Sequence, residues 1–182
     1  EDVDFGPVIT AASKANIENL VQTGIDQGAS LVVDGRGFKL QGYEDGFFVG
    51  AHLFDNVTTD MDIYKKEIFG PVLSTVRAKT YEEAIQMAID HEYGNGTSIF
   101  TRDGDTARDF SNRINIGMVG VNVPIPVPLA YHTFGGWKKS MFGDLNQHGP
   151  DAFKFFTRTK TITSRWPSGI KEGGEFSIPV ME

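Results

Sequence analysis

The feature that most restricts the fold is an alternation of short apolar runs and amphipathic stretches between residues 72 and 123. Residues 72–78, 98–100 and 118–123 have the composition of buried strands. Residues 80–90 and 103–114, which lie between them, repeat apolar side chains at helical spacing. Strands and helices in this order predict an α/β fold with a parallel sheet. Such a sheet offers ligands a crevice at the carboxyl ends of its strands.

Local signals in this region indicate where each helix begins. Thr80 and Glu83 form a capping box, in which each side chain can accept a free backbone N–H of the first turn. Asp103 can cap the second helix in the same way. The side chains expected on the buried faces are Tyr81, Ala84, Ile85, Ala88 and Ile89 in the first helix, and Ala107, Phe110 and Ile114 in the second.

The two ends of the chain differ in character. Residues 11–27 have helical periodicity, and Gly28 can end that helix in a left-handed conformation. Residues 30–33, 47–49 and 52–54 are expected to be extended. Near the other end, residues 157–166 read TRTKTITSRW, an alternating, β-branched run. It predicts a strand that lies away from the main sheet and pairs with another chain.

Composition excludes several classes of protein. The 182 residues contain no cysteine, which excludes disulfides, thiolate metal sites and a cysteine nucleophile within them. The formal charge is −7, and no basic face suited to a phosphate backbone is visible. No apolar run is long enough to span a bilayer. His52, His91, His132 and His148 are too widely spaced to indicate a metal site. We therefore expect no metal, nucleic acid or membrane partner.

Three stretches contain residue types suited to binding: EIFGPV at 67–72, VNVPIPVP at 121–128 and FGGWKKS at 134–140. Each has an ordinary interpretation when it is taken alone. The first can be a solvated carboxylate before a turn, the second a rigid extended segment and the third a tight turn. In that interpretation Asn122 is structural rather than catalytic, and Lys138 and Lys139 are solvated.

Taken together and in this order, the three stretches resemble the C-terminal half of the aldehyde dehydrogenase superfamily. The longer run FGGWKKSMFGDLNQHGPDAFKFFTRTKTITSRW and the loop VPIPVPLAYH are similar to its coenzyme-A-acylating branch, that of the methylmalonate-semialdehyde dehydrogenases. The resemblance extends over essentially the whole chain. One departure is Met141, where the family usually has glycine, so this position either adopts an ordinary backbone conformation or tolerates strain.

The resemblance implies roles for a few residues. Glu67 would accept hydrogen bonds from the hydroxyls of the nicotinamide ribose of NAD, and Phe69 would pack near the nicotinamide ring. Phe134, Pro126 and Pro128 would line the funnel through which the substrate enters. The resemblance also implies a division of the chain. Residues 1–156 would belong to the catalytic domain, and residues 157–182 would form an oligomerisation strand and a C-terminal tail.

The chemistry of this family is covalent. A cysteine thiolate attacks the aldehyde, and hydride transfer to NAD leaves a thioester. In this branch coenzyme A accepts the acyl group and carbon dioxide is lost. The nucleophile, the oxyanion-binding asparagine, the nucleotide-binding motif and the substrate arginines all lie upstream in the family. The resemblance therefore implies that this chain, which begins with Glu1 rather than methionine, is the C-terminal piece of such an enzyme and is inactive alone.

The expected partners are the N-terminal, NAD-binding portion of the same protein and further copies in a dimer or tetramer. The expected location is the cytoplasm, or the mitochondrial matrix if the source is a eukaryote. Two alternatives remain open. The chain could be a non-catalytic domain that associates with itself through residues 157–166. It could also be a piece of an aldehyde dehydrogenase that hydrolyses its thioester.

Overall fold

The computed structural model describes residues 4–164 and residue 166, in two compact units. The first unit extends to Pro128 and also includes Phe134–Gly143. The second unit contains Leu129–Thr133 and the chain from Asp144 onward. The division predicted at residue 156, between a catalytic portion and an oligomerisation strand, stays a prediction.

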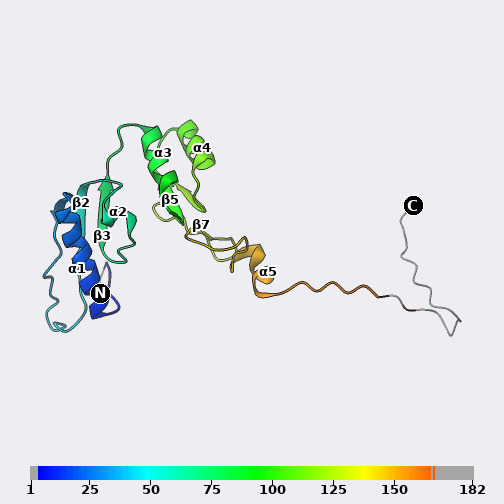
Figure 1. Ribbon diagram of the computed structural model, residues 1–182, viewed down its shortest axis with the longest axis horizontal. Helices are drawn as coiled ribbons and strands as arrows, with labels where there is room; N and C mark the ends of the chain where they lie inside the picture. The colour runs from blue at the N-terminus through cyan, green and yellow to red at the C-terminus, as the bar shows by residue number, and fades with distance from the viewer. Residues whose placement is uncertain (1–3, 165, 167–182) are drawn as a thin grey trace. The chain divides into compact units, whose positions relative to one another are not determined.

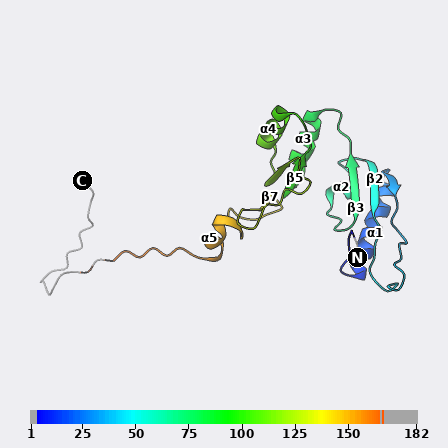
Figure 2. The ribbon, with the colours of Figure 1, turned by 180° about the vertical axis from the view of Figure 1, so that it is seen from behind.

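The N-terminal part of the first unit is a three-stranded sheet with a long helix against it. Helix α1 spans Ala11–Asp26 and begins where the hydroxyl of Thr10 accepts the N–H of Ser13 at 3.0 Å. Strands β1 (Ser30–Val33), β2 (His52–Val57) and β3 (Val72–Val76) form the sheet in the order β1-β2-β3. The short helix α2 (Asp62–Lys65) connects β2 to β3. Helix α1 lies alongside β2 and β3 in both ribbon views (Figures 1 and 2).

This sheet is mixed, so the prediction of one parallel sheet is only partly right. Strands β2 and β3 are parallel, whereas β1 runs antiparallel to β2. The physical reason lies in the connections. A loop over residues 34–51 returns the chain from β1 to β2, whereas a parallel neighbour requires a crossover such as the one that contains α2. Residues 47–49 belong to this loop and form no strand of the sheet, and Val49 is buried.

The core of this part is formed by α1 and the sheet. The predicted apolar face of α1 is confirmed, because Ile17, Leu20 and Val21 are buried and Ile25 packs against the same cluster. Phe54 and Val57 of β2 and Ile63 of α2 complete the core. Gly28 follows the helix with a φ of 99°, as predicted.

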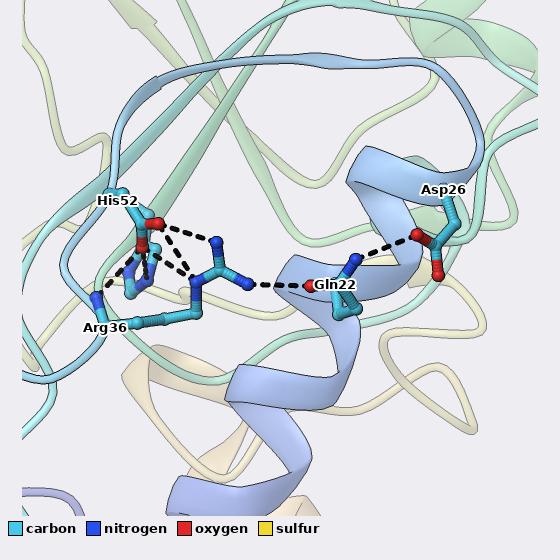
Figure 3. A network of polar contacts seen from close by, with 5 residues as sticks. Gln22, Asp26, Arg36 and His52 are labelled. Carbon is cyan, nitrogen blue, oxygen red and sulfur yellow. Dashed lines mark hydrogen bonds and ion pairs between the residues drawn. The ribbon is translucent and has the colours of Figure 1, made fainter.

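A polar network fastens the loop after β1 to helix α1 (Figure 3). The guanidinium of Arg36 donates to both carboxylate oxygens of Asp34 and, at 2.8 Å, to Oε1 of Gln22. This pairing lowers the pKa of Asp34 to about 2. His52 lies beneath the pair, with Nε2 3.7 Å from Oδ1 of Asp34. Neither ring nitrogen of His52 has a hydrogen-bond partner among the residues that the structure describes.

The remainder of the first unit has the predicted order of strands and helices. Helices α3 (Tyr81–Asp90) and α4 (Gly104–Arg113) lie beside β5 (Gly96–Ile99), which pairs in parallel with β6 (Met118–Val121). The two helices are neighbours in Figures 1 and 2. Ile85, Phe110 and Ile114 are buried between these elements, as predicted. Ala84 is exposed, contrary to the prediction, because it lies at the edge of the apolar stripe of α3.

The helix caps predicted from sequence are present. Thr80 accepts the N–H of Glu83 at 3.2 Å, and Asp103 accepts the N–H of Thr106 at 2.6 Å. The carboxylate of Glu83 accepts the N–H of Lys79 at 2.7 Å instead of that of Thr80. The bond from the Thr80 side chain is therefore that of a standard capping box, whereas the bond to the Glu83 side chain comes from the residue before the N-cap.

Two further pieces complete the described chain. Strands β4 (Tyr93–Gly94) and β7 (Trp137–Lys138) pair antiparallel within the first unit. In the second unit a 3₁₀ turn, η1 (Gly149–Asp151), leads into helix α5 (Ala152–Phe156). Residues 157–164 pair with no other described strand, so the strand predicted over 157–166 and its pairing with another chain stay predictions. The predicted tail over 167–182 lies outside the described residues. None of the helices in the described residues is long and apolar enough to cross a membrane.

Candidate functional site

The turn over residues 66–71, which we call the Glu67 turn, presents two side chains to the exterior. Phe69 has a φ of 54°, a left-handed conformation that is uncommon for a bulky residue. Its ring is 81% exposed, and Glu67 is exposed as well. A strained backbone of this kind persists only where surrounding contacts enforce it.

Contacts with α1 and β2 enforce the Glu67 turn. A Cβ atom at Gly70 would lie 2.5 Å from Cδ1 of the buried Ile17, so this position requires a glycine. The carbonyl of Pro71 accepts the N–H of His52 at 2.9 Å, and that of Gly70 accepts the N–H of Val72 at 2.8 Å. The Gly-Pro pair thus fixes the backbone to the sheet while the preceding Glu and Phe side chains remain accessible.

Glu67 lines a hollow of about 500 Å³. The other lining residues are Tyr64, Lys65, Lys66, His91, Tyr93, Asn95, Lys139 and Ser140. Two of the lysines are paired, Lys66 with Asp62 at 2.7 Å and Lys139 with Glu92. The carboxylate at this hollow can accept hydrogen bonds from a ligand's hydroxyl groups. Phe69 does not line the hollow, so the structure brings only one of the two predicted cofactor residues to it.

The FGGWKKS stretch contains a residue whose role the sequence analysis missed. Lys138 was expected to be solvated, but its Nζ donates to the carbonyls of Ala88 at 3.1 Å, Ile89 at 2.7 Å and His91 at 2.9 Å. These carbonyls lie at the end of α3, where peptide oxygens lack intrahelical partners and the helix dipole favours a cation. Lys139 is exposed, as predicted.

The glycines of this stretch permit a close approach of two backbone segments. A Cβ atom at Gly117 would lie 2.2 Å from the carbonyl oxygen of Gly135. The structure assigns no turn to Phe134–Gly136, so the tight turn expected there is absent. Instead this segment packs directly against the residue that precedes β6. Met141, where the family usually has glycine, is not among the residues with positive φ, so of the two expectations the ordinary backbone conformation is the one present.

The proline segment begins at Asn122, which has a φ of 57°. Its side-chain amide pairs with the backbone of Thr101, accepting the N–H at 2.9 Å and donating to the carbonyl at 3.0 Å. This structural role agrees with the expectation. Pro126 packs over Gly96 of β5, with Cγ 3.1 Å from where a Cβ would be. The predicted funnel residues Phe134, Pro126 and Pro128 are half-buried, and none of them lines the Glu67 hollow.

Comparison with known proteins decides the family. The sequence profile of the aldehyde dehydrogenase family matches residues 1–162. The chain belongs to the aldehyde dehydrogenase family. The resemblance noted from the three sequence stretches is thereby confirmed.

Individual relatives are similar over nearly the whole chain. A malonate-semialdehyde dehydrogenase of Pseudomonas aeruginosa is 58% identical over 97% of this chain, and the chain covers 36% of that protein. The mitochondrial, acylating methylmalonate-semialdehyde/malonate-semialdehyde dehydrogenase of Bos taurus is 49% identical over 98% of this chain, which covers 33% of it. The chain therefore spans about a third of the length of the curated relatives it matches.

A solved structure supports the same fold. The crystal structure described as a methylmalonate-semialdehyde dehydrogenase from Sinorhizobium meliloti, complexed with NAD, superimposes with a TM-score of 0.86 at 72% identity. The match covers 92% of this chain and 34% of that one. The predicted α/β class is confirmed, with the mixed sheets described above. Among the described residues no group of three or more acidic or histidine side chains could hold a metal ion.

Proposed function

We propose that this chain supplies the nicotinamide-side wall of the cofactor site in an NAD-dependent semialdehyde dehydrogenase. The observation that carries the proposal is the Glu67 turn, a strained backbone that contacts with α1 and β2 hold in place while Glu67 and Phe69 stay accessible. Strain that neighbouring contacts enforce at an exposed position indicates a binding role more than a folding role.

The residues at this turn fit the ribose and nicotinamide of NAD. The carboxylate of Glu67 offers two oxygens, which suit the two vicinal hydroxyls of a ribose. The exposed ring of Phe69 offers an apolar face of the kind on which a flat heteroaromatic ring packs. Bound NAD would supply the hydride acceptor. In this proposal the chain's own part is to hold the ribose and thereby fix the face that the nicotinamide presents.

The proposed substrate is malonate or methylmalonate semialdehyde, with coenzyme A as the acceptor of the acyl group and loss of carbon dioxide. The names of relatives at 58% and 49% identity support this substrate class. Since the chain contains no cysteine, the thiolate nucleophile in this proposal comes from other residues of a longer protein. The chain alone is then expected to be inactive. The proposed compartment is the cytoplasm, or the mitochondrial matrix in a eukaryote.

The test of the cofactor role is Glu67→Gln in the full-length enzyme. Replacing an ionised acceptor by an amide weakens hydrogen bonds to the ribose, so we expect kcat/KM for NAD to fall about tenfold. The fold should survive, because Glu67 is exposed. The matched control is Glu18→Gln in α1, away from the Glu67 hollow, which should leave the kinetics unchanged. Unchanged kinetics in Glu67→Gln would remove the proposed role.

Coenzyme A dependence separates the acylating enzyme from the hydrolytic alternative. We expect acyl-coenzyme A to accumulate with NADH when coenzyme A is present. Free acid at an undiminished rate without coenzyme A would instead identify an enzyme that hydrolyses its thioester.

We also propose that the C-terminal part contacts other chains or other parts of the protein. In the second unit Phe153 is 80% exposed and Phe156 73% exposed, which is unusual for aromatic side chains without a covering surface. The proposed partners are the N-terminal, NAD-binding portion of the enzyme and further copies in a dimer or tetramer. The alternative, a non-catalytic domain that self-associates through residues 157–166, predicts an oligomer of the isolated chain. A monomer in size-exclusion chromatography would contradict it.

A further inference from the structure

His91 connects three elements around the Glu67 hollow. Its Nδ1 is 3.1 Å from the backbone nitrogen of Tyr93, and its Nε2 is 3.2 Å from the carbonyl oxygen of Tyr64. Because a backbone N–H can only donate, Nδ1 must be the acceptor and Nε2 must carry the hydrogen. The neutral ring thus accepts from the start of β4 and donates to α2.

Helix α2 and the end of α3 each donate a hydrogen bond to the other. The hydroxyl of Tyr64 donates to the carbonyl of Met87 at 3.1 Å. Burial raises the pKa of this phenol, so it remains a protonated donor. The rings of Tyr64 and His91 meet edge to face with centroids 5.1 Å apart. Tyr64 is therefore bonded through both its backbone and its side chain, three residues before Glu67.

The end of α3 is itself anchored by β7. Lys138 donates to the carbonyl of His91 as well as to those of Ala88 and Ile89. A continuous series of hydrogen bonds thus leads from the FGGWKKS stretch, through the end of α3, to the segment that precedes Glu67. The FGGWKKS stretch is thus linked to Tyr64, which lies three residues before the EIFGPV stretch.

Helix α2 needs such anchors because it has only four residues, too few to be stable by itself. Its beginning is tied to α1, where Oε1 of Gln27 accepts the N–H of Asp62 at 2.8 Å. Its end is tied by His91 and by the hydroxyl of Tyr64. Loss of the His91 donor would leave the end of α2 that lies next to Glu67 held by the Tyr64 hydroxyl alone, while the beginning would stay fixed.

We propose that His91 is a positioning residue for cofactor binding, which holds the Glu67 carboxylate at the hollow by donating to the carbonyl of Tyr64. This inference rests on the NAD role of Glu67 proposed above. The competing explanation is purely local. In it, His91 matters only because its Nδ1 accepts the N–H of Tyr93 and shapes the turn into β4.

Two amide variants separate these explanations. In His91→Asn the side-chain oxygen can replace Nδ1 and keep the bond from Tyr93, but the side chain is too short to reach Tyr64. In His91→Gln the amide nitrogen can replace Nε2 and keep the bond to Tyr64, while the bond from Tyr93 is lost. A positioning role therefore predicts damage from Asn and rescue by Gln, and a local role predicts the reverse.

The measurement is the Kd for NAD of the full-length enzyme, determined by calorimetric titration. We expect His91→Asn to raise the Kd about fivefold, the effect of one lost hydrogen bond, and His91→Gln to stay within about twofold of wild type. Hydrogen exchange should quicken at the amides of residues 64–67 in His91→Asn alone. An unchanged Kd in His91→Asn, or damage only in His91→Gln, would overturn the proposal.

A double-mutant cycle with Glu67→Gln gives a readout that a general loss of structure would not produce. If His91 acts through Glu67, adding His91→Asn to Glu67→Gln should raise the Kd by less than about twofold further. Multiplied effects would show independent action and overturn the inference alone. If Glu67→Gln itself leaves NAD binding unchanged, the proposed function of Glu67 fails and the inference fails with it. The exchange rates would still show whether His91 holds α2.

Discussion

The Glu67 turn and the corner around Lys138 use the same backbone strain for opposite purposes. Phe69 and Lys138 are both non-glycine residues in the left-handed region, with φ of 54° and 55°. Phe69 directs its ring outward, where it is 81% exposed. Lys138 directs its ammonium group onto three carbonyls at the end of α3. One strained residue is available to a ligand and the other holds the scaffold.

The difference shows that strain alone does not identify a binding residue. In the Glu67 turn the backbone makes anchoring contacts through Gly70 and Pro71, and the side chains of Glu67 and Phe69 stay accessible. At the Lys138 corner the side chain is the anchor. What separates a candidate ligand contact from a structural residue is therefore whether the side chain itself makes the anchoring contacts, and not the backbone conformation.

The comparison predicts its largest effect at Lys138. Lys138→Met keeps the length of the aliphatic stem but removes the donor, so three carbonyls at the end of α3 lose their partner. We expect the full-length protein to lose about 2 kcal/mol of unfolding free energy in urea denaturation. Lys139→Met is the matched control and should change stability far less, because Lys139 is exposed and makes one ion pair. Equal losses in the two variants would mean that the contacts of Lys138 add nothing.

Much of the fold could be predicted from local sequence signals. The caps at Thr80 and Asp103, the apolar faces of α1 and α4 and the glycine after α1 depend on residues within one or two turns, and the structure contains them all. The antiparallel direction of β1 could not be predicted. The 18-residue loop over 34–51 contains no sequence pattern that indicates whether the next strand runs parallel or antiparallel to β1. The burial predicted for Ala84 was wrong, because burial at that edge of α3 depends on which neighbouring element covers it.

The candidate site divides in the same way. EIFGPV could be recognised because its residues are adjacent in the sequence. The contacts of Lys138 with the end of α3 span 47 to 50 residues, and those of His91 with Tyr64 span 27. A lysine next to another lysine, or an isolated histidine, has no local signal for such a bond. Side chains that bridge distant elements can be found only once the elements are placed.

A smaller effect is expected at Phe69, where the cost of the left-handed backbone can be measured directly. Glycine accepts this conformation without a Cβ clash, whereas alanine retains the clash and loses the ring. Phe69→Gly should therefore be more stable than Phe69→Ala by about 1 kcal/mol in the full-length protein. Both variants should bind NAD more weakly if the ring contacts the nicotinamide. Equal stability would mean that the backbone at this position relaxes and that no strain is held there.

The smallest effect is the pH dependence of the ion pair between Lys139 and Glu92. The hydrogen bond from Lys139 lowers the pKa of Glu92, and the same bond raises the pKa of Lys139. A lowered carboxyl pKa stabilises the fold above the unfolded pKa, and that contribution is lost as the pH falls through the folded pKa. A raised lysine pKa stabilises the fold below its unfolded value and loses that contribution as the pH rises through the folded pKa.

The contribution of the pair is therefore complete between the unfolded pKa values, about 4 for Glu92 and about 10 for Lys139, and it declines as the pH moves outside that range. The urea midpoint of Lys139→Met should differ slightly from that of wild type at pH 7, and the two midpoints should converge as the pH falls through the lowered pKa of Glu92. The cost of Lys138→Met should persist at pH 3, because the carbonyls that Lys138 contacts do not titrate. If the cost at Lys138 also disappeared in acid, its anchoring would depend on a nearby carboxylate, and the contrast between the two lysines would be wrong.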